Sequence, residues 1–226
     1  MHSKSNILLN IFFICFITMG FSQHGTVKIV NGIGIYAGIT QYDLVSNNFT
    51  TKKGAGWMLG ASATVDLPHK WYNMSYNIQL AENNLGIAAS NIGYSNEEFI
   101  DYKVLTAQIA LLVHIKLIES FLTIDVGPML QYNGQLDLDD KNQGGFMIAN
   151  YNNLLAKDIK EISRFNVDGA IGLSAGFNHF RLKAQYIYGI LNTLDNLNKQ
   201  NLDQTGNTGK FKGNQSMLAF TAMVSF

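Results

Sequence analysis

The sequence predicts an all-β fold, an eight-stranded antiparallel up-and-down transmembrane β-barrel with long extracellular loops. Apolar and polar residues alternate with a period of two over eight segments of 9 to 15 residues. The connections between these segments alternate between short and long, as in outer-membrane barrels. No stretch beyond the N-terminus reaches the roughly 20 apolar residues of a membrane-spanning helix. An even strand number places both chain termini at the short-turn, periplasmic end of the barrel.

Residues 1–22 are predicted to be a cleaved signal peptide. Lys4 precedes an apolar run over 7–19, and small residues Gly20 and Ser22 fit a cleavage site. The run is too short for a membrane anchor. Cleavage leaves residues 23–226 as one barrel domain without cysteine, because Cys15 lies in the signal. This excludes disulfides and thiolate chemistry from the mature chain.

The composition narrows the class of protein and its partners. The chain has 226 residues, of which 47% are hydrophobic and only 14% are charged. That apolar content excludes intrinsic disorder. Lys and Arg together number 16, as do Asp and Glu, so no net field favours nucleic acid as a partner.

The predicted strands follow one another with clear alternation. In the third, Tyr76 and Ile78 alternate with Asn77 and Gln79. The predicted segments are 27–41, 57–67, 72–80, 105–115, 122–132, 165–177, 180–188 and 217–226. Short connections are predicted at 68–70, 116–120 and 178–179, and longer ones at 43–53, 83–101, 133–164 and 189–214. Pro128 cannot donate a ladder hydrogen bond, so a β-bulge is expected there.

The apolar face is predicted to meet lipid, because its aromatic residues gather near both strand ends as two interfacial girdles. The girdle at the long-loop end comprises Trp57, Tyr132, Phe165, Tyr186 and Tyr188. The girdle at the short-turn end comprises Tyr72, Phe177, Phe180 and Phe226. The alternative is a soluble, lipocalin-like ligand-binding barrel with its apolar face inward.

Six titratable residues on the polar face form a predicted lumen charge network. They are Lys28, Asp66, His114, Asp125, Arg181 and Lys183. We expect them to pair across a narrow lumen as a structural plug, with Asp125 meeting Lys183 or Arg181, because unpaired buried charges are costly. The alternative is a path for protons or small solutes, which would make the protein a small-solute channel.

No catalytic residue, metal site or cofactor is predicted. The histidines lack metal-ligand spacing, and no Gly-x-Ser-x-Gly elbow or phosphate loop is present. His114 is expected to have no partner for a catalytic triad. The chain is therefore predicted to be non-enzymatic.

The two longest connections carry further expectations. Loop 133–164 is expected either to form a lid on the barrel mouth or to offer a partner-binding surface, with a short helix starting at Asn152 or Asn153 that buries Ile159 and Ile162. The neighbouring Asp-x-Asp-Asp run at 137–140 lacks the rest of a calcium-loop pattern. Loop 192–214 shows no periodicity and is expected to be mobile.

Three short motifs carry a resemblance to a known family. They are Gly-Pro-Met-Leu-Gln-Tyr at 127–132, Asp-Gly-Ala-Ile-Gly-Leu at 168–173 and Tyr-Ile-Tyr-Gly-Ile-Leu-Asn at 186–192. With the signal ending Phe-Ser-Gln at 21–23 and the terminal Phe226, they resemble the PorT-like outer-membrane β-barrel family of Bacteroidota. The resemblance implies an outer-membrane location, contact with lipid, and partners among other outer-membrane or secretion proteins. It implies a non-enzymatic role through the extracellular loops or within a secretion or assembly complex.

Overall fold

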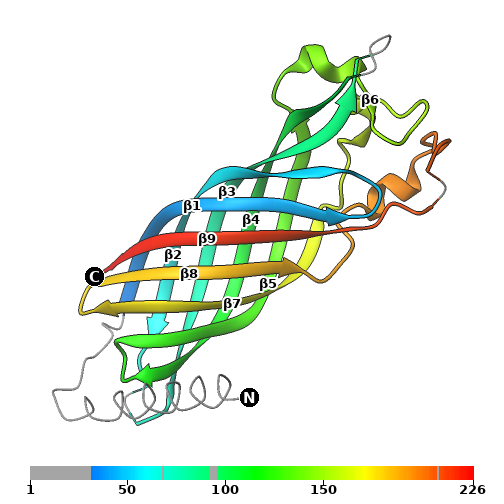
Figure 1. Cartoon of the computed structure of the whole chain (residues 1–226). Coiled ribbons are helices and arrows are strands. Elements are labelled where there is room, and N and C mark those ends of the chain that lie inside the picture. Colours follow the sequence, from blue (N-terminus) through cyan, green and yellow to red (C-terminus); the bar gives the residue numbers. More distant parts are fainter. Residues whose placement is uncertain (1–31, 68, 92–95, 208) are drawn as a thin grey trace, which may run out of the picture.

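The computed structural model describes residues 32–226 except 68, 92–95 and 208, and it forms a closed barrel (Figure 1). Eight strands pair in the ring order β1–β2–β3–β4–β5–β7–β8–β9, every pair is antiparallel, and β9 closes on β1. The predicted fold class is confirmed. The predicted signal peptide at 1–22 and the lumen residue Lys28 lie outside the described residues.

The ring strands differ greatly in length. Their bounds are β1 Gly32–Ser46, β2 Thr51–Val65, β3 Tyr72–Ser90, β4 Glu97–Ile118, β5 Leu122–Leu138, β7 Phe165–Phe177, β8 Phe180–Gly189 and β9 Gly213–Ser225. The short strand β6 (Met147–Ile148) pairs with the end of β3. Three short 3-10 helices, η1 (Lys141–Gly145), η2 (Ala156–Ile159) and η3 (Asp195–Lys199), lie in the long connections. No helix in the described part of the chain combines the length and apolar character needed to cross a membrane.

The connection predicted at 83–101 is mostly strand, which corrects the sequence interpretation. β3 and β4 run on as a paired ribbon from Asn83 and Val104 to Ser90 and Glu97. In the β3 half of this ribbon the alternation is lost, because residues 85–89 are buried on both faces. A strand covered on both sides has no polar face, so a period-two pattern does not reveal it.

Burial is inverted relative to a soluble barrel. Ile33 and Ile39 on the outer face are 65% and 66% exposed, whereas Asn77 and Gln79 on the inner face are 1% and 3% exposed. A lipocalin-like barrel would bury the apolar face, so the soluble alternative is wrong. The arrangement suits a hydrocarbon surround, because the closed ring leaves no backbone edge unpaired.

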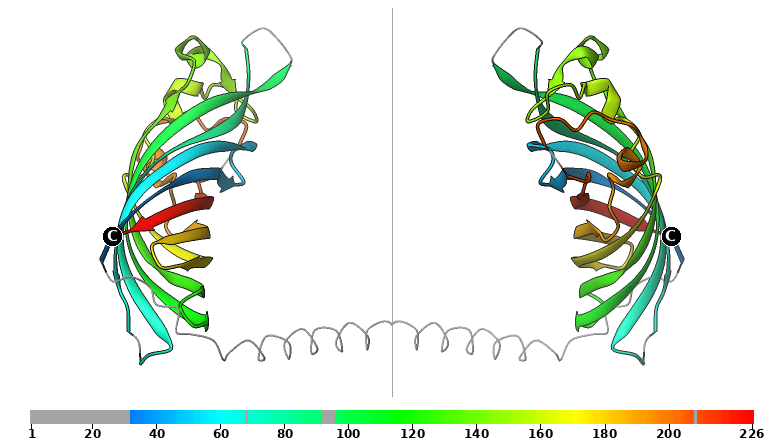
Figure 2. Two further views of the ribbon diagram at one scale, coloured as in Figure 1. Left: turned by 90° about the vertical axis from the view of Figure 1, so that its left-hand side faces the viewer. Right: turned by 90° about the vertical axis from the view of Figure 1, so that its right-hand side faces the viewer.

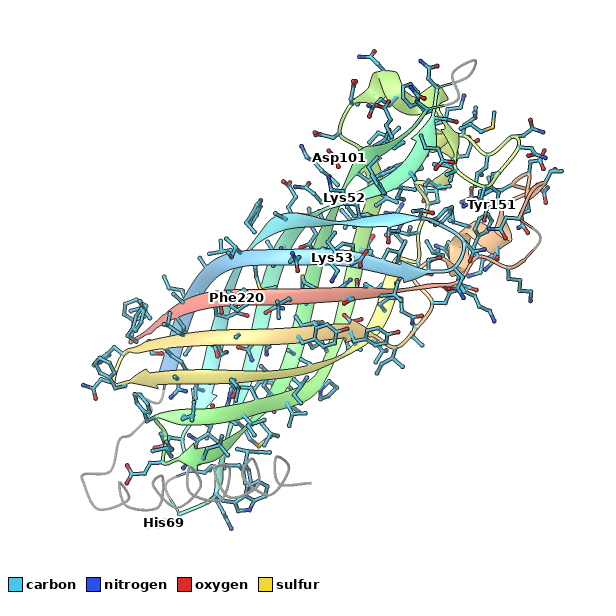
Figure 3. The ribbon with its side chains drawn as sticks, in the orientation of Figure 1. Lys52, Lys53, His69, Asp101, Tyr151 and Phe220 are labelled. Atoms are coloured by element: carbon cyan, nitrogen blue, oxygen red, sulfur yellow. The ribbon has the colours of Figure 1, made fainter. Side chains whose placement is uncertain are left out.

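The predicted girdle residues lie on the outer face, but Trp57 lies in the middle part of β2 (Thr51–Val65) and not at the strand end where it was expected. Eight of the nine are exposed, and Tyr72 is half-buried. Tyr132 and Phe165 make an edge-to-face pair with ring centroids 5.1 Å apart on neighbouring strands. Phe220, labelled in Figure 3, is an exposed aromatic part way along β9, so the outer surface between the girdles is not purely aliphatic.

The expected bulge at Pro128 is wrong. Pro128 pairs opposite Gly169 in an uninterrupted β5–β7 register, and the β4–β5 register is the same on both sides of it. The β4–β5 ladder instead shifts register between Val104 and Thr106 and between Lys116 and Ile118. The proline is accommodated because no pair with β4 is made at its position.

The long strands β3, β4 and β5 carry a folded cap on one side of the rim, as Figure 2 shows. We call this cap the head. It consists of the ends of β3 and β4 together with connections 47–50, 139–164 and 190–212. These connections lie at the end of the barrel opposite the short turns.

Candidate functional site

A chain of four glutamine amides crosses the lumen, and we call it the amide belt. Gln79, Gln108 and Gln131 follow one another on β3, β4 and β5, with each side chain hydrogen-bonded to the next. Gln131 also donates to Gln215 on β9. From β1, the Tyr36 hydroxyl donates to Gln79 Oε1 at 2.7 Å. Side chains from five strands are thus connected to one another across the inside of the ring.

Tyr36 needs a glycine opposite it. A Cβ added to Gly60 would lie 2.4 Å from the Tyr36 ring, so only glycine on β2 leaves space for the ring to lean across the lumen. The ammonium group of Lys183 lies 5.4 Å from the Tyr36 ring centroid. The aromatic face therefore helps to compensate a buried cation.

A second group, the lumen cluster, lies nearer the short turns and centres on His114. His114 Nδ1 is 2.7 Å from Asp125 Oδ1, and His114 Nε2 is 2.7 Å from Ser75 Oγ. Thr123 donates to the same carboxylate oxygen at 2.7 Å, and Ser174 lies 3.2 Å from it. Every one of these side chains is buried. With the proton assigned to Nδ1, the imidazole donates to Asp125 and accepts from Ser75.

The cations join this cluster less directly than the sequence suggests. Arg181 donates to Ser174 Oγ at 3.0 Å and to the Ser120 carbonyl, so it reaches Asp125 through Ser174. Lys183 attracts Asp125 electrostatically without a hydrogen bond to it. The direct partner of Asp125 is His114, not Lys183 or Arg181 as expected.

Asp66 lies nearer the barrel end. Its carboxylate is 3.5 Å from Lys116 Nζ, and that ammonium also donates to the Leu67 carbonyl at 3.0 Å. The predicted network does not include Lys116, because this residue follows the fourth predicted segment and begins the predicted short connection 116–120.

Ser75, His114 and Asp125 stand in the order of a serine-hydrolase triad, which the sequence prediction missed. No local motif joins them, since they come from three different strands. The cavity beside His114, which Arg181 and Lys183 also line, has a volume of about 10 Å³. That is room for about one water molecule. The arrangement is a closed hydrogen-bond relay with no space for a substrate carbonyl.

Some lumen polar atoms have no protein partner among the described residues. They include Asn73 Nδ2, Asn77 Oδ1, Asn166 Oδ1 and Gln185 Nε2. Buried polar groups of this kind are ordinarily satisfied by water. The lumen is therefore hydrogen-bonded through most of its length but is not a dry, fully paired core.

The head has an apolar core of its own. Phe49, Tyr151 and Phe211 form an aromatic cluster with centroid separations of 5.7 to 6.0 Å, and all three rings are buried (Tyr151 in Figure 3). Buried aliphatic side chains extend this cluster: Ile87, Ile100, Ile148, Leu154, Ile159, Ile162, Leu194 and Leu197. Of the two expectations for loop 133–164, packing over the mouth matches the structure.

Loop 192–214 is anchored at both of its ends, whereas the described residues of its middle part, 199–210, are exposed or half-buried. Phe211 is fully buried, and its carbonyl accepts hydrogen bonds from the amides of Asn192 and Asn198, each at 2.9 Å. The Asn152 backbone N–H donates to the Thr205 carbonyl at 2.8 Å, which joins the two long connections. Asparagine side chains here replace the regular ladder, so no period is visible in the sequence.

The predicted helix after Asn152 is only the short helix η2. Ile159 and Ile162 are buried as expected. The Tyr102 hydroxyl of β4 donates to the Ala156 carbonyl at 2.9 Å, and burial raises the pKa of this phenol. The helix is therefore anchored to the barrel wall by a neutral donor.

The acidic run beside η1 is occupied by protein contacts. Asp139 pairs with Lys103, and Asp140 accepts from the Asn142 backbone N–H at 2.9 Å. In the described ranges, no three His, Cys, Asp or Glu side chains lie close enough to hold a metal ion.

Comparisons with known proteins find solved structures of similar fold but do not assign the chain to a family. No protein-family model matches the chain, and no curated protein matches its sequence, so the PorT-like resemblance stays a prediction. Ail of Yersinia pestis is 10% identical, with a TM-score of 0.44, over 87% of this chain and 100% of that one. OprG of Pseudomonas aeruginosa is 11% identical, with a TM-score of 0.42, over 86% and 94%. The outer-membrane enzyme PagL is 11% identical, with a TM-score of 0.42, over 85% and 99%.

Proposed function

We propose that this chain is an integral outer-membrane β-barrel that acts through its extracellular head and is not an enzyme. The observation that carries the proposal is the contrast between a filled lumen and a folded head. In barrels of this kind the short turns face the periplasm, so the head faces outward. The PorT-like resemblance adds the narrower possibility that the head or barrel wall contacts a secretion or assembly complex.

The lumen argues against transport and catalysis. An eight-stranded barrel has an interior just wide enough for its own side chains, and the amide belt fills that width. The Ser75–His114–Asp125 relay lies beside a space of about 10 Å³. We expect a serine-reactive fluorophosphonate to leave Ser75 unlabelled in the folded protein. Labelling that His114→Ala abolishes would overturn the non-enzymatic assignment.

Sidedness is tested by cysteine labelling on intact cells. Lys210 lies in the head, and His69 lies in a short turn at the other end (Figure 3); both are exposed. A membrane-impermeant maleimide should label Lys210→Cys on intact cells and His69→Cys only after permeabilisation. The reverse pattern would place the head in the periplasm. Release of the protein from membranes by carbonate would end the membrane assignment.

A small-solute channel is the second candidate, favoured by the lumen atoms without protein partners. Planar-bilayer recording separates the two candidates. The intact protein should show no stable conductance, and Gln131→Ala, which removes a central member of the belt, should conduct more. A steady conductance of the intact protein that Gln131→Ala leaves unchanged would favour the channel.

A further inference from the structure

The head carries a groove that the lumen and the aromatic cluster do not explain. It lies between the end of β5 and the helices η1 and η2, and its volume is about 490 Å³. Ligand pockets for small molecules commonly measure about 300–1,000 Å³. Lys141, Lys157 and Lys160 line it, so we call it the lysine groove.

The charge in the lysine groove is unbalanced. All three lysines are exposed, and within the described residues none of them takes part in an ion pair. Asp137 is the single carboxylate among the lining residues. Two other cations of the head are paired: Arg164 with Glu161 at 2.9 Å and Lys199 with Asp195 at 3.1 Å.

Neighbouring carboxylates are held by other partners. Asp139 pairs with Lys103, and Asp158 accepts from the Leu155 backbone N–H at 3.2 Å. Among the residues that line the groove, three ammonium groups stand against one carboxylate, so the lining carries an excess of positive charge although the whole chain is neutral. Ammonium groups arranged around a concave surface focus a field that attracts anions.

The backbone that carries the lysines is fixed before any ligand arrives. The Leu136 backbone N–H donates to the Lys160 carbonyl at 2.9 Å, which ties β5 to the end of η2. The Ala156 backbone N–H donates to the Phe146 carbonyl at 2.8 Å, and Ile159 is fully buried beneath the helix. A binding site whose backbone is already ordered loses less conformational entropy when the ligand binds.

The groove lies outside the lipid band. Leu136 follows the girdle residue Tyr132 along β5, and a strand rises about 3.3 Å per residue. The groove floor is therefore on the order of 13 Å along the strand beyond the interface. Leu136 and Leu138 give it apolar walls beside the ammonium groups. Lipid acyl chains do not reach this height, whereas saccharides on a cell surface do.

We propose that the lysine groove binds a small polyanionic saccharide, one that bears phosphate or sulfate groups. The ammonium groups pair with the anionic groups, and the leucines contact the C–H faces of the ring. The natural source is either a free saccharide or the sugar portion of a membrane glycolipid. The proposal deepens the function proposed above and rests on it only for the natural source of the ligand.

The first test measures binding of inositol hexakisphosphate to the full-length mature protein in detergent, by calorimetry. We expect saturable binding that weakens with salt. Lys157→Ala with Lys160→Ala should lower the affinity about tenfold or more, since charge-assisted hydrogen bonds are lost. Lys210→Ala with Lys212→Ala removes the same charge elsewhere on the head and should change the affinity less than about twofold. Equal losses in both doubles would overturn the groove as the site.

The second test fills the groove and keeps its charge. A Cβ added at Gly144 meets only Lys157 Cβ at 3.6 Å and Leu138 Cδ1 at 3.8 Å, both in the groove lining, whereas at Gly145 it meets nothing within 4 Å. Gly144→Leu should therefore lower the affinity about tenfold, a free-energy change that one lost contact group can supply. Gly145→Leu should bind as the parent does. Parent-like binding by Gly144→Leu, with the heat-modifiable gel shift intact, would overturn the proposal.

The natural source is decided by competition. Purified lipopolysaccharide that displaces inositol hexakisphosphate identifies a glycolipid sugar, and displacement by free sugar phosphates alone identifies a soluble ligand. Sucrose, which is uncharged, should not compete; if it does, the anionic class is wrong. The detergent measurement does not depend on sidedness, so failure of the cysteine-labelling test and failure of binding are separate results.

Discussion

The interior of the lumen is packed with polar side chains, whereas the interior of the head is packed with apolar ones. Inside the ring, Gln79, Gln108 and His114 are buried and joined to neighbours by directional hydrogen bonds. In the head, Phe211 and Leu154 are buried in an apolar core like that of any water-soluble domain. The boundary between the two styles falls along β3, where alternation gives way to burial on both faces.

The difference follows from the solvent on the outside. Where lipid surrounds the barrel, apolar side chains face outward, and the interior must be held by polar contacts that satisfy one another. Where water surrounds the head, burying apolar area again provides the driving force. The two regions should therefore respond differently to the loss of one side chain.

The largest effect is expected in the lumen. Asp125→Ala removes the carboxylate that His114, Thr123 and Ser174 contact and that faces the buried Lys183. Removing one partner of a buried charged pair costs about 3–5 kcal/mol. Reversible unfolding in lipid should show this loss, and Asp125→Ala with Lys183→Met should recover only the part that comes from the uncompensated Lys183, because the hydrogen bonds of Asp125 with His114 and Thr123 stay lost. A cost below about 1 kcal/mol, typical of an exposed pair, would mean that the lumen is far wetter than described.

The next effect is confined to the head. Leu154→Ala deletes a buried side chain of the head core, and such truncations cost about 2–5 kcal/mol. Proteolysis within 139–164 should accelerate while the heat-modifiable gel shift of the barrel stays unchanged. Leu155→Ala, at a half-buried neighbouring position, is the control and should have a smaller effect. Loss of the barrel shift in Leu154→Ala would show that the regions are not separable.

The outer face gives a depth-dependent effect. Ile171 is 56% exposed and lies midway along β7 between Phe165 and Phe177. Ile171→Arg should cost about 2–4 kcal/mol at the bilayer midplane, whereas Phe177→Arg near the interface should cost about 0–1 kcal/mol. Unfolding titrations in lipid measure both. Equal costs would mean that the girdles do not mark the membrane boundaries.

The smallest effect is a pH response in the head. Hydrogen bonds from Thr205 and Asn153 hold the pKa of Asp203 below its ordinary value of 3.8. A lowered pKa stabilises the fold above the ordinary value, and the stabilisation is lost as the pH falls through the folded value. Amide exchange at Thr205, corrected for intrinsic rates, should therefore become faster on acidification.

Two variants check this response. Asp203→Asn should abolish the pH dependence of exchange, since the titrating carboxylate is gone. Asp195→Asn, which removes the exposed pair with Lys199, should preserve it. A response that persists in Asp203→Asn belongs to another group.

The strands that can be predicted from the sequence are those with one face toward lipid and the other face toward the polar lumen. Lipid on one side and a polar lumen on the other impose alternation, so β7 was predicted to the residue and the inward position of His114 was predicted as well. The end of β3 carries no such pattern, since residues 85–89 are buried on both faces. The end of β4 does alternate, but there the apolar residues Ile100 and Tyr102 are the buried ones, the reverse of the arrangement within the lipid-facing part of the barrel.

The contact between His114 and Asp125 depends on register. These residues are directly opposite in the β4–β5 pairing, and the pairing shifts between Lys116 and Ile118 beside the turn. A face pattern says which residues point inward but not which ones stand at the same height. The sequence therefore predicts correctly that His114 and Asp125 point into the lumen, but it does not predict that they are partners.

Because the strands are unequal in length, the barrel wall is taller on one side of the molecule than on the other. β3, β4 and β5 have 19, 22 and 17 residues, whereas β7, β8 and β9 have 13, 10 and 13. A neighbour approaching β8 meets a low rim, and one approaching β4 meets a tall wall. Rotation about the membrane normal therefore changes what the protein presents, so lateral encounters at this barrel are directional before any specific contact forms.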